Sequence, residues 1–482
     1  MIPRTSLEEE LAELGRWKLR PEQAQMRIFE RLTRNEFQAV GEHRVRSDNA
    51  LANFVHFAAS RVPYYRDLFS QRALRPDAIR GVRDLPRLPV LKKQDVIERA
   101  GEMRAGRLPD GEEPPVVYSS TGTTGQPVTV LMSRSNSRMF AYLWHRQARW
   151  FRFDPKGCFA KIRIPSTLPR QVDGSPMPKG VAMRRDGWTY LTPFFETGPE
   201  VTFSISEPVE KQIGWLRHFR PSYMLAYPGV FEELALACDS APPVSGLKAL
   251  LGIGSTATPS MRAWIERVYG IPLEQNYGLN EIGMVAIRCV AGRYHVNTET
   301  CLVEIVDREG QPCAPGTRGH VLVTSLQNIA MPLIRYDTGD IALAVDGPCP
   351  CGRTLPSFGE IAGRYRRYAG LPAGTRERVR ALQQEVEAMP PELVRNLRRY
   401  QVYQDAENRF EVRVKVVGPL PPEFEGRLRE RWKTVCGDPP RPLAIIEGAT
   451  ILSSPGGKRL DFDSALYARD DSAALARAET VG

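Results

Sequence analysis

The chain has 482 residues, 42% hydrophobic and 25% charged, which is the composition of a soluble globular protein and enough length for two or three domains. Its formal net charge of +10 suits anionic ligands such as nucleotides, but no basic stripe interleaved with aromatic residues indicates nucleic acid binding. Since the sequence has no run of eighteen apolar residues and no signal-peptide core at its N-terminus, we expect a cytoplasmic protein that does not span a membrane.

Helical patterns dominate residues 1 to about 110, and an α/β pattern follows them. Segment 49–70 has apolar residues at helical spacing and ends in a Pro-Tyr-Tyr turn. Up to about residue 345, short apolar runs then alternate with amphipathic stretches, as in α/β proteins. The pattern predicts strands at 116–118, 223–227, 249–255 and 273–278, a helix at 259–270, and antiparallel strands at 299–307 and 319–326.

A domain boundary is expected near Gly363, where the pattern changes to that of a compact α+β unit. The unit contains predicted helices at 375–388 and 422–437 and predicted strands at 409–418 and 443–452. The tail after residue 469 is expected to be frayed helix or disorder. The predicted fold is therefore α/β, with a large N-terminal α/β domain (1–362) that has mixed sheets and a β-subdomain, and a small mobile α+β C-terminal domain (363–482).

The loop at 119–127 consists almost entirely of serines, threonines and glycines, and it directly follows an apolar run. Its backbone amides can converge on a phosphate, because Gly122 and Gly125 tolerate positive φ and carry no Cβ. Five hydroxyl groups add hydrogen-bond donors, and no acidic side chain repels an anion. Taken alone, such a loop is more often a plain flexible connection, and it is not a Walker P-loop because no Gly-Lys-Ser/Thr follows.

Two later segments carry residues that suit the rest of a nucleotide. In 275–283, the aromatic ring of Tyr277 can stack on a purine base, and Glu281 can hold a divalent cation against phosphates. In 331–340, Asp340 follows a Thr-Gly turn, where a carboxylate can accept hydrogen bonds from both hydroxyl groups of a ribose. Each segment alone is also explained as an ordinary strand end or turn.

A third segment, 453–462, places Lys458 on a glycine-flanked loop near the C-terminus. An ammonium group there can neutralise the charge that develops on a carboxylate and an α-phosphate during attack. An exposed Gly-Gly-Lys loop without function is the alternative. The order of all four segments along the chain is what gives them weight as one site.

Together and in this order, the four segments resemble the motifs of the adenylate-forming superfamily of acyl- and aryl-CoA ligases, adenylation domains and luciferases. Within it, the chain is most similar to the phenylacetate–CoA ligase and capsule-biosynthesis branch. The similarity covers nearly all of the chain from about residue 50. It is carried by RVPYYRDLF at 61–69, LPVLKKQDV at 88–96, SSTGTTGQPV at 119–128, YGLNEIG at 277–283, AMPLIRYDTGD at 330–340, CPCGR at 349–353 and IAGR at 361–364.

The resemblance implies that a small, aromatic carboxylic acid attacks the α-phosphate of Mg·ATP and that pyrophosphate leaves. The small domain then rotates, and a thiol, usually that of coenzyme A, displaces AMP. By motif, the β- and γ-phosphates would be cradled by Ser120, Thr121, Gly122, Thr123, Thr124 and Gly125. The nucleoside would be bordered by Gly254, Ser255, Thr256, Tyr277 (stacked on adenine), Gly278, Asp340 (on ribose) and Arg364. The catalytic set would be Lys458, Thr123 and the Mg²⁺ ligand Glu281.

Two positions depart from the family pattern. Gln126 replaces the usual lysine after the last glycine of the phosphate loop. At the hinge, where the family reads Gly-Arg-x-Asp, the chain retains Arg364 but has Arg366 in place of the acid. Adenylation is therefore expected more firmly than thiol transfer. The alternative is an adenylating enzyme of secondary metabolism that passes the acyl group to an amine, a carrier protein or another nitrogen nucleophile.

The eight cysteines of a cytosolic chain argue against disulfides, but their clustering suggests a metal. Cys289 and His295 form one pair at ligand spacing, and Cys349 and Cys351 form another. A Cys₃His set of this kind is typical of structural zinc, and some members of the resembled branch carry zinc in a similar arrangement. Packed cysteines with an incidental histidine are the alternative.

The acid pocket and the oligomeric state are the least determined features. The family builds its acid pocket between the phosphate loop and the adenine segment, where this chain has Tyr142, Trp144, His145 and Lys161. These side chains equally suit a protein core or a helix surface. A homodimer is one open alternative for the assembly.

Overall fold

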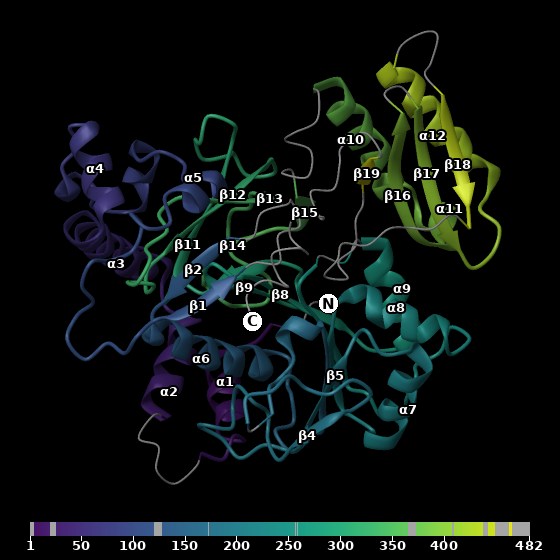
Figure 1. Ribbon diagram of the computed structural model, residues 1–482, viewed down its shortest axis with the longest axis horizontal. Helices are drawn as coiled ribbons and strands as arrows, with labels where there is room; N and C mark the ends of the chain where they lie inside the picture. Colours follow the sequence, from purple (N-terminus) through teal and green to yellow (C-terminus); the bar gives the residue numbers. More distant parts are fainter. Residues whose placement is uncertain are drawn as a thin grey trace.

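The computed structural model describes residues 4–19, 26–119, 128–171, 173–255, 257, 259–364, 373–406, 409–436, 442–448 and 462–464. Its N-terminal part is helical, as predicted (Figure 1). The helices are α1 (Leu7–Leu14), α2 (Met26–Asn35), α3 (Val40–Arg61), α4 (Pro63–Gln71) and α5 (Lys93–Glu98), with 3-10 turns η1 (Pro76–Ala78) and η2 (Val82–Arg87). The expected Pro-Tyr-Tyr turn is wrong: Pro63 opens α4, at a helix position where the missing N–H is not needed.

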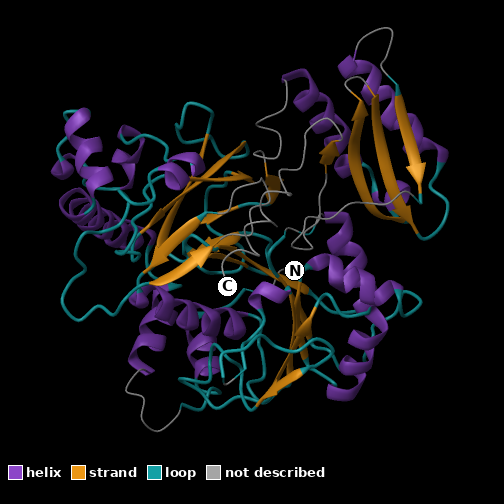
Figure 2. Ribbon diagram, viewed as in Figure 1, coloured by secondary structure: helices purple, strands orange, loops and turns teal. Residues whose placement is uncertain are grey.

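A nine-stranded mixed sheet forms the centre of the molecule (Figure 2). Its strand order is β14-β10-β9-β8-β7-β6-β3-β5-β4, and the five neighbours from β8 to β5 are parallel. The strands are β3 (Phe159–Arg163), β4 (Met183–Arg185), β5 (Glu200–Ser204), β6 (Tyr223–Ala226), β7 (Ala249–Gly252), β8 (Leu273–Leu279), β9 (Gly283–Arg288), β10 (Tyr294–Val296) and β14 (Ser357–Phe358).

Helices cover both faces of the parallel strands, since alternate residues of each strand point to opposite sides. Leu225 and Leu251 pack with α6 (Arg134–Trp150), whereas Met224 and Leu250 pack on the other face. That other face is covered by α7 (Val209–Phe219), α8 (Pro228–Leu236) and α9 (Pro259–Tyr269), and η3 (Pro165–Thr167) follows β3. The carboxyl ends of the parallel strands are the edge at which α/β proteins bind their ligands.

A four-stranded antiparallel sheet packs against α3 and α4 through a shared hydrophobic core. Its strands are β11 (Cys301–Val306), β12 (Arg318–Ser325), β13 (Tyr336–Leu343) and β15 (Ile361–Arg364). A two-stranded ribbon of β1 (Val116–Ser119) and β2 (Thr129–Met132) flanks the phosphate-loop segment. This sheet and ribbon correspond to the predicted β-subdomain.

The C-terminal part has a separate four-stranded sheet with its own core (Figure 1). Its elements are α10 (Ala373–Ala388), α11 (Pro391–Val394), β16 (Leu397–Ala406), β17 (Arg409–Val416), α12 (Pro422–Cys436), β18 (Leu443–Glu447) and β19 (Phe462–Ser464). The α+β composition agrees with the sequence pattern. The boundary at residue 363 stays a prediction, and β15 runs to Arg364. None of the helices in the described ranges is long and apolar enough to cross a membrane.

Candidate functional site

Tyr277 and Asp340, expected at the adenine and the ribose, lie in direct contact. Tyr277 is near the end of β8, and Asp340 is in β13 of the neighbouring sheet. The Tyr277 hydroxyl donates a hydrogen bond to Asp340 Oδ2 at 2.7 Å, across 63 residues of sequence. Both side chains are buried. The fold therefore brings together two residues that the sequence associates only by motif.

The turn after β7 carries Gly254 and Ser255 to the same edge of the sheet. β7 and β8 are parallel neighbours, with Gly252 opposite Gln275, so their carboxyl ends meet. Gly254 has φ of +71°, and a Cβ there would lie 2.3 Å from the Tyr227 ring. Only glycine fits both the conformation and the contact. Gly278 is the exposed residue after Tyr277.

Glu281 lies in the tight connection between β8 and β9, and Tyr336 holds its carboxylate. The buried Tyr336 hydroxyl donates to Glu281 Oε1 at 3.2 Å. The preceding residue, Asn280, donates from Nδ2 to the carbonyl oxygen of Ser119 at 3.5 Å. The residue before Glu281 therefore contacts Ser119, which directly precedes the predicted phosphate loop. Sequence reasoning missed Tyr336, although it stands inside the quoted motif at 330–340.

Arg335, the residue before Tyr336, has an unusual backbone conformation that its side-chain contacts stabilise. This non-glycine residue has φ of +53° and is buried. Its guanidinium pairs with Glu304 at 3.0 Å and donates to the carbonyl oxygen of Leu88 at 2.7 Å and to that of Gly310. Several hydrogen bonds to one buried guanidinium can hold a backbone conformation that would otherwise be unfavourable. The strained residue therefore lies directly before the one that contacts Glu281.

Several predicted site residues lie outside the described part of the chain. They are Ser120, Thr121, Gly122, Thr123, Thr124, Gly125, Gln126, Thr256, Arg366 and Lys458. For Arg364 the backbone is described, and its Cα is paired with that of Asp340 across β13 and β15. The backbone of Arg364, which is expected at the hinge, therefore lies directly beside Asp340, which is expected to bind ribose.

The four predicted metal ligands, Cys289, His295, Cys349 and Cys351, form one buried cluster. Their ligand atoms all lie within 4.8 Å of one another. Cys289 Sγ and Cys349 Sγ are 3.6 Å apart, and Cys351 Sγ is 3.3 Å from His295 Nε2. Tetrahedral zinc separates such ligand atoms by roughly 3.5–3.8 Å, so the set fits that ion.

The electrostatics of the cluster also suit a cation, because one of its thiols readily loses its proton. His295 Nδ1 lies 3.0 Å from the Leu355 carbonyl oxygen and donates to it, which leaves Nε2 free to face the sulfur atoms. Burial by itself lowers the pKa of His295, but hydrogen bonds with Cys349 and Cys351 raise it to about 9. Hydrogen bonds from Cys289 and Cys349 lower the pKa of the Cys351 thiol. The cluster thus favours a thiolate at Cys351, and a zinc ion would replace the proton that the neighbouring sulfur atoms hold on His295 Nε2.

The aromatic residues considered for the acid pocket belong to the core. Tyr142, Trp144 and His145 are buried in the cluster that contains α6, and His145 stacks on Phe195 with ring centroids 4.7 Å apart. Lys161 is also buried, and its ammonium pairs with Glu200 at 2.8 Å.

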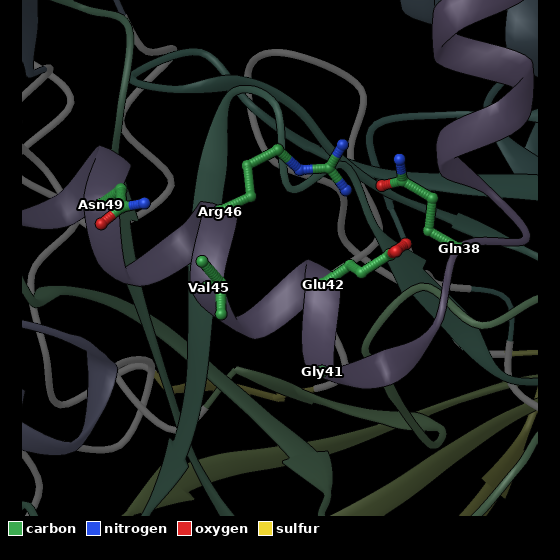
Figure 3. A pocket seen from close by; sticks show the side chains of 6 residues that line it. All are labelled: Gln38, Gly41, Glu42, Val45, Arg46 and Asn49. Carbon is green, nitrogen blue, oxygen red and sulfur yellow. The ribbon is translucent and has the colours of Figure 1, made fainter.

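A separate recess of about 510 Å³ lies along the start of α3 (Figure 3). It is lined by Gln38, Gly41, Glu42, Val45, Arg46 and Asn49. None of these is a predicted site residue, so the recess is no part of the nucleotide site.

The family profile described as "AMP-binding enzyme" matches residues 70–331, more than half of the chain. The chain belongs to the AMP-binding enzyme family. The match begins in α4 and includes the phosphate-loop segment, Gly254, Tyr277 and Glu281. The predicted membership in the adenylate-forming superfamily is therefore confirmed.

Curated relatives of this AMP-binding enzyme include phenylacetate-coenzyme A ligases. That of Thermus thermophilus is 29% identical over 347 residues, covering 70% of this chain and 72% of the relative. That of Escherichia coli K12 is 27% identical over 318 residues, covering 64% and 68%. These matches make the chain an AMP-forming ligase of the predicted kind.

The predicted fold class is confirmed by solved structures. The crystal structure of 2-hydroxyisobutyryl-CoA ligase in the postadenylation state superposes with a TM-score of 0.68 at 19% identity, covering 93% of this chain and 94% of that one. At this identity the likeness concerns the fold alone. It extends over both the central sheet and the C-terminal α+β part.

Proposed function

We propose that this AMP-binding enzyme adenylates a small aromatic carboxylic acid with ATP and then transfers the acyl group to coenzyme A. The contact between Tyr277 and Asp340 carries the proposal, because it joins a base-stacking ring and a ribose-binding carboxylate at the carboxyl edge of the parallel strands. Family membership and the phenylacetate-coenzyme A ligase relatives support it. Gly254 has no Cβ to collide with the Tyr227 ring, and it is exposed at the edge of the sheet where the base would lie.

The chemistry requires positioning and charge neutralisation rather than a nucleophilic side chain. A carboxylate oxygen of the acid attacks the α-phosphorus of ATP, the bond to the bridging oxygen breaks, and pyrophosphate leaves. Lys458 neutralises charge on the attacking carboxylate and α-phosphate, while the 120–125 loop donates to the departing phosphates. In the second step, the sulfur of coenzyme A attacks the acyl carbon, AMP leaves, and the thiol proton passes to solvent.

Glu281 is the residue that would hold Mg²⁺, which supplies charge neutralisation for the phosphates when bound. Its carboxylate accepts a hydrogen bond from Tyr336 at Oε1, so with respect to the described residues Oε2 is the oxygen available for a cation. The contact of the preceding residue, Asn280, with the carbonyl oxygen of Ser119 supports this role, because Ser119 directly precedes the predicted phosphate loop. Hard oxygen ligands of this kind match the preference of Mg²⁺.

The Cys₃His cluster is proposed to hold a structural zinc ion. Four protein ligands leave no open coordination position, which is the arrangement of structural rather than catalytic zinc. The ligands come from β9–β10 and from the loop before β14. Zinc would therefore fasten the end of the nine-stranded sheet.

ATP–pyrophosphate exchange with a panel of aryl, cinnamyl and amino-aryl acids tests the proposal, followed by product analysis with and without coenzyme A. We expect exchange with at least one acid and a CoA thioester only when coenzyme A is present. Asp340→Ala should raise the KM for ATP, whereas Asp405→Ala, at an exposed pair with Arg409 in the C-terminal part, serves as the control. Absence of both exchange and ATP binding would refute adenylation. An amide formed without coenzyme A would instead establish the alternative acceptor.

A further inference from the structure

A pair of amides, the buried Gln147 and the half-buried Asn276, joins α6 to β8 next to the proposed adenine site. Asn276 Nδ2 donates to Gln147 Oε1 at 2.9 Å. Gln147 is only 1% exposed, and its Nε2 has no hydrogen-bond partner among the residues that the structure describes. Buried polar groups are nearly always paired, so an orphaned amide in a protein of this kind requires an explanation.

Reversing the two amides does not remove the orphan. If Asn276 Oδ1 accepted from Gln147 Nε2, Gln147 Oε1 would be left without a partner instead. Only one of the two polar atoms of Gln147 is used by the contact with Asn276. A hydroxyl group both donates and accepts, so it satisfies either orientation.

The pair lies on the side of β8 opposite to the contact with Asp340. Asn276 immediately precedes Tyr277, and consecutive strand residues point to opposite faces. Tyr277 reaches Asp340 on one side, and Asn276 reaches α6 on the other. The start of α6 is fixed next to Glu281, because Asn136 Nδ2 donates to the Ile282 carbonyl oxygen at 3.2 Å.

Three apolar side chains pack on the same face of the sheet as the amide pair. Phe140 and Tyr190 contact each other with ring centroids 5.0 Å apart, and both are only partly buried. Ile253, the residue before Gly254, is also partly buried and packs on the same cluster. In an acyl adenylate the acyl group is bonded to the α-phosphate, so under the proposed function it would lie close to Glu281. The α6 face of β8 combines a position next to Glu281 with aromatic and polar side chains.

We infer that the acid carries a hydroxyl group on its aromatic ring and that Gln147, held by Asn276, binds this group. The inference rests on the proposed function and names the substrate class of the same site. A site built to bind a hydroxyl group disfavours the acid that lacks it, because the buried amide then stays unpaired. Phe140 and Tyr190 contact the ring itself.

ATP–pyrophosphate exchange measured with matched acids tests this inference. The pairs are phenylacetate and its hydroxylated forms, benzoate and the three hydroxybenzoates, and cinnamate and the coumarates. For the preferred ring position, we expect kcat/KM to be about 10- to 100-fold higher for the hydroxylated acid. Gln147→Met keeps the length of the side chain and removes its amide, and it should abolish the preference while leaving the KM for ATP unchanged.

Two further variants keep the result interpretable. Asn276→Leu removes the hydrogen bond that holds Gln147, so it should also reduce the preference for the hydroxylated acid. This variant provides the test if Gln147→Met does not fold. Gln212→Met is the matched control, because this buried glutamine on α7 bonds the carbonyl oxygens of Ile205 and Glu207 on the other face of the sheet. It should retain the full preference.

Exchange that is equally fast with unsubstituted acids would overturn the inference and leave adenylation standing. An unchanged preference in both Gln147→Met and Asn276→Leu would overturn it as well, since the orphaned amide would then serve a buried water molecule only. Failure of every acid, together with failure to bind ATP, would instead refute the proposed function.

Discussion

Tyr336 shows how a single hydroxyl group can set the position of a carboxylate, here that of Glu281, which is proposed to hold Mg²⁺. We expect Tyr336→Phe to lower the rate of pyrophosphate release about tenfold at limiting Mg²⁺, since a hydrogen bond to a charged group contributes about 1.5–3 kcal/mol. Excess Mg²⁺ should restore most of the rate. Titration of activity with Mg²⁺ measures this. Tyr269→Phe removes a buried hydroxyl that donates to the Phe231 carbonyl oxygen on the far helical face, and it should leave the titration unchanged.

The burial of His145 should make the stability of the protein depend on pH. Burial, and secondarily Arg146, lower the pKa of His145 to about 3, and its Nε2 has no partner in the described part of the chain. The unfolded chain binds a proton near pH 6.5 while the folded chain does not, so the free energy of unfolding falls as the pH decreases from about 6.5 toward 3. Between pH 7 and pH 5 this amounts to about 2 kcal/mol.

Denaturant unfolding of His145→Phe at both pH values tests this. The aromatic substitution suits the contacts with Trp17, Phe29 and Phe195, and it removes the titrating group. The loss of stability between pH 7 and pH 5 should shrink by about 2 kcal/mol relative to the unchanged chain. An identical loss in both proteins would contradict the assignment. The exposed His56 provides a control, since His56→Phe leaves the buried imidazole in place.

At the scale of elements, α1 is fastened to the Cys₃His cluster. The buried Glu10 of α1 pairs with Arg353 at 2.6 Å and also with Arg149 of α6. Arg353 lies 3.9 Å over the Trp150 ring and follows Cys351 by two residues. The backbone N–H of Thr5 donates to the Cys351 carbonyl oxygen at 3.0 Å. The loop that would be ordered by zinc is therefore the loop that holds the N-terminal helix.

If zinc occupies the cluster as proposed, its removal should loosen α1. We expect a chelator, or Cys351→Ser, to increase amide hydrogen exchange across residues 7–14 by at least tenfold, because an unfastened helix end opens at a lower free energy. Hydrogen exchange read by mass spectrometry, with zinc content measured in parallel, checks this. Cys238→Ser, at a cysteine outside the cluster, should change neither quantity. Protection of α1 that is independent of zinc content would refute the coupling.

The central strands could be predicted because their apolar runs and flanking helices are local signals, and β6, β7, α9 and β11 form where the pattern placed them. The Cys₃His cluster was likewise visible from ligand spacing. The partners of Arg149 could not be predicted, since Glu10 and Glu36 are more than a hundred residues away and nothing local distinguishes a buried arginine from an exposed one. The same holds for Tyr336 and Glu281, which meet only once two sheets pack together.

At the scale of the whole molecule, the hydrophobic core of the C-terminal part shares no residue with the cores of the larger part. Its buried side chains, from Val379 to Phe462, are all separate from the three clusters of the larger part. We propose that the chain divides into two folding units close to the predicted position. The division should fall after Arg364 rather than at 363, because Gly363 and Arg364 pair with Ile341 and Asp340 and complete the four-stranded sheet.

A chain that ends at Arg364 should therefore fold cooperatively and bind ATP, since Gly254, Tyr277, Glu281 and Asp340 all lie in the larger part. It should not release pyrophosphate, because Lys458 is missing. Calorimetry, nucleotide binding and pyrophosphate release distinguish these properties. Full-length Lys458→Ala is the matched comparison and should likewise bind ATP without turnover. A truncated chain that fails to fold would show that the two cores depend on each other, and one that retains full adenylation would remove Lys458 from the mechanism.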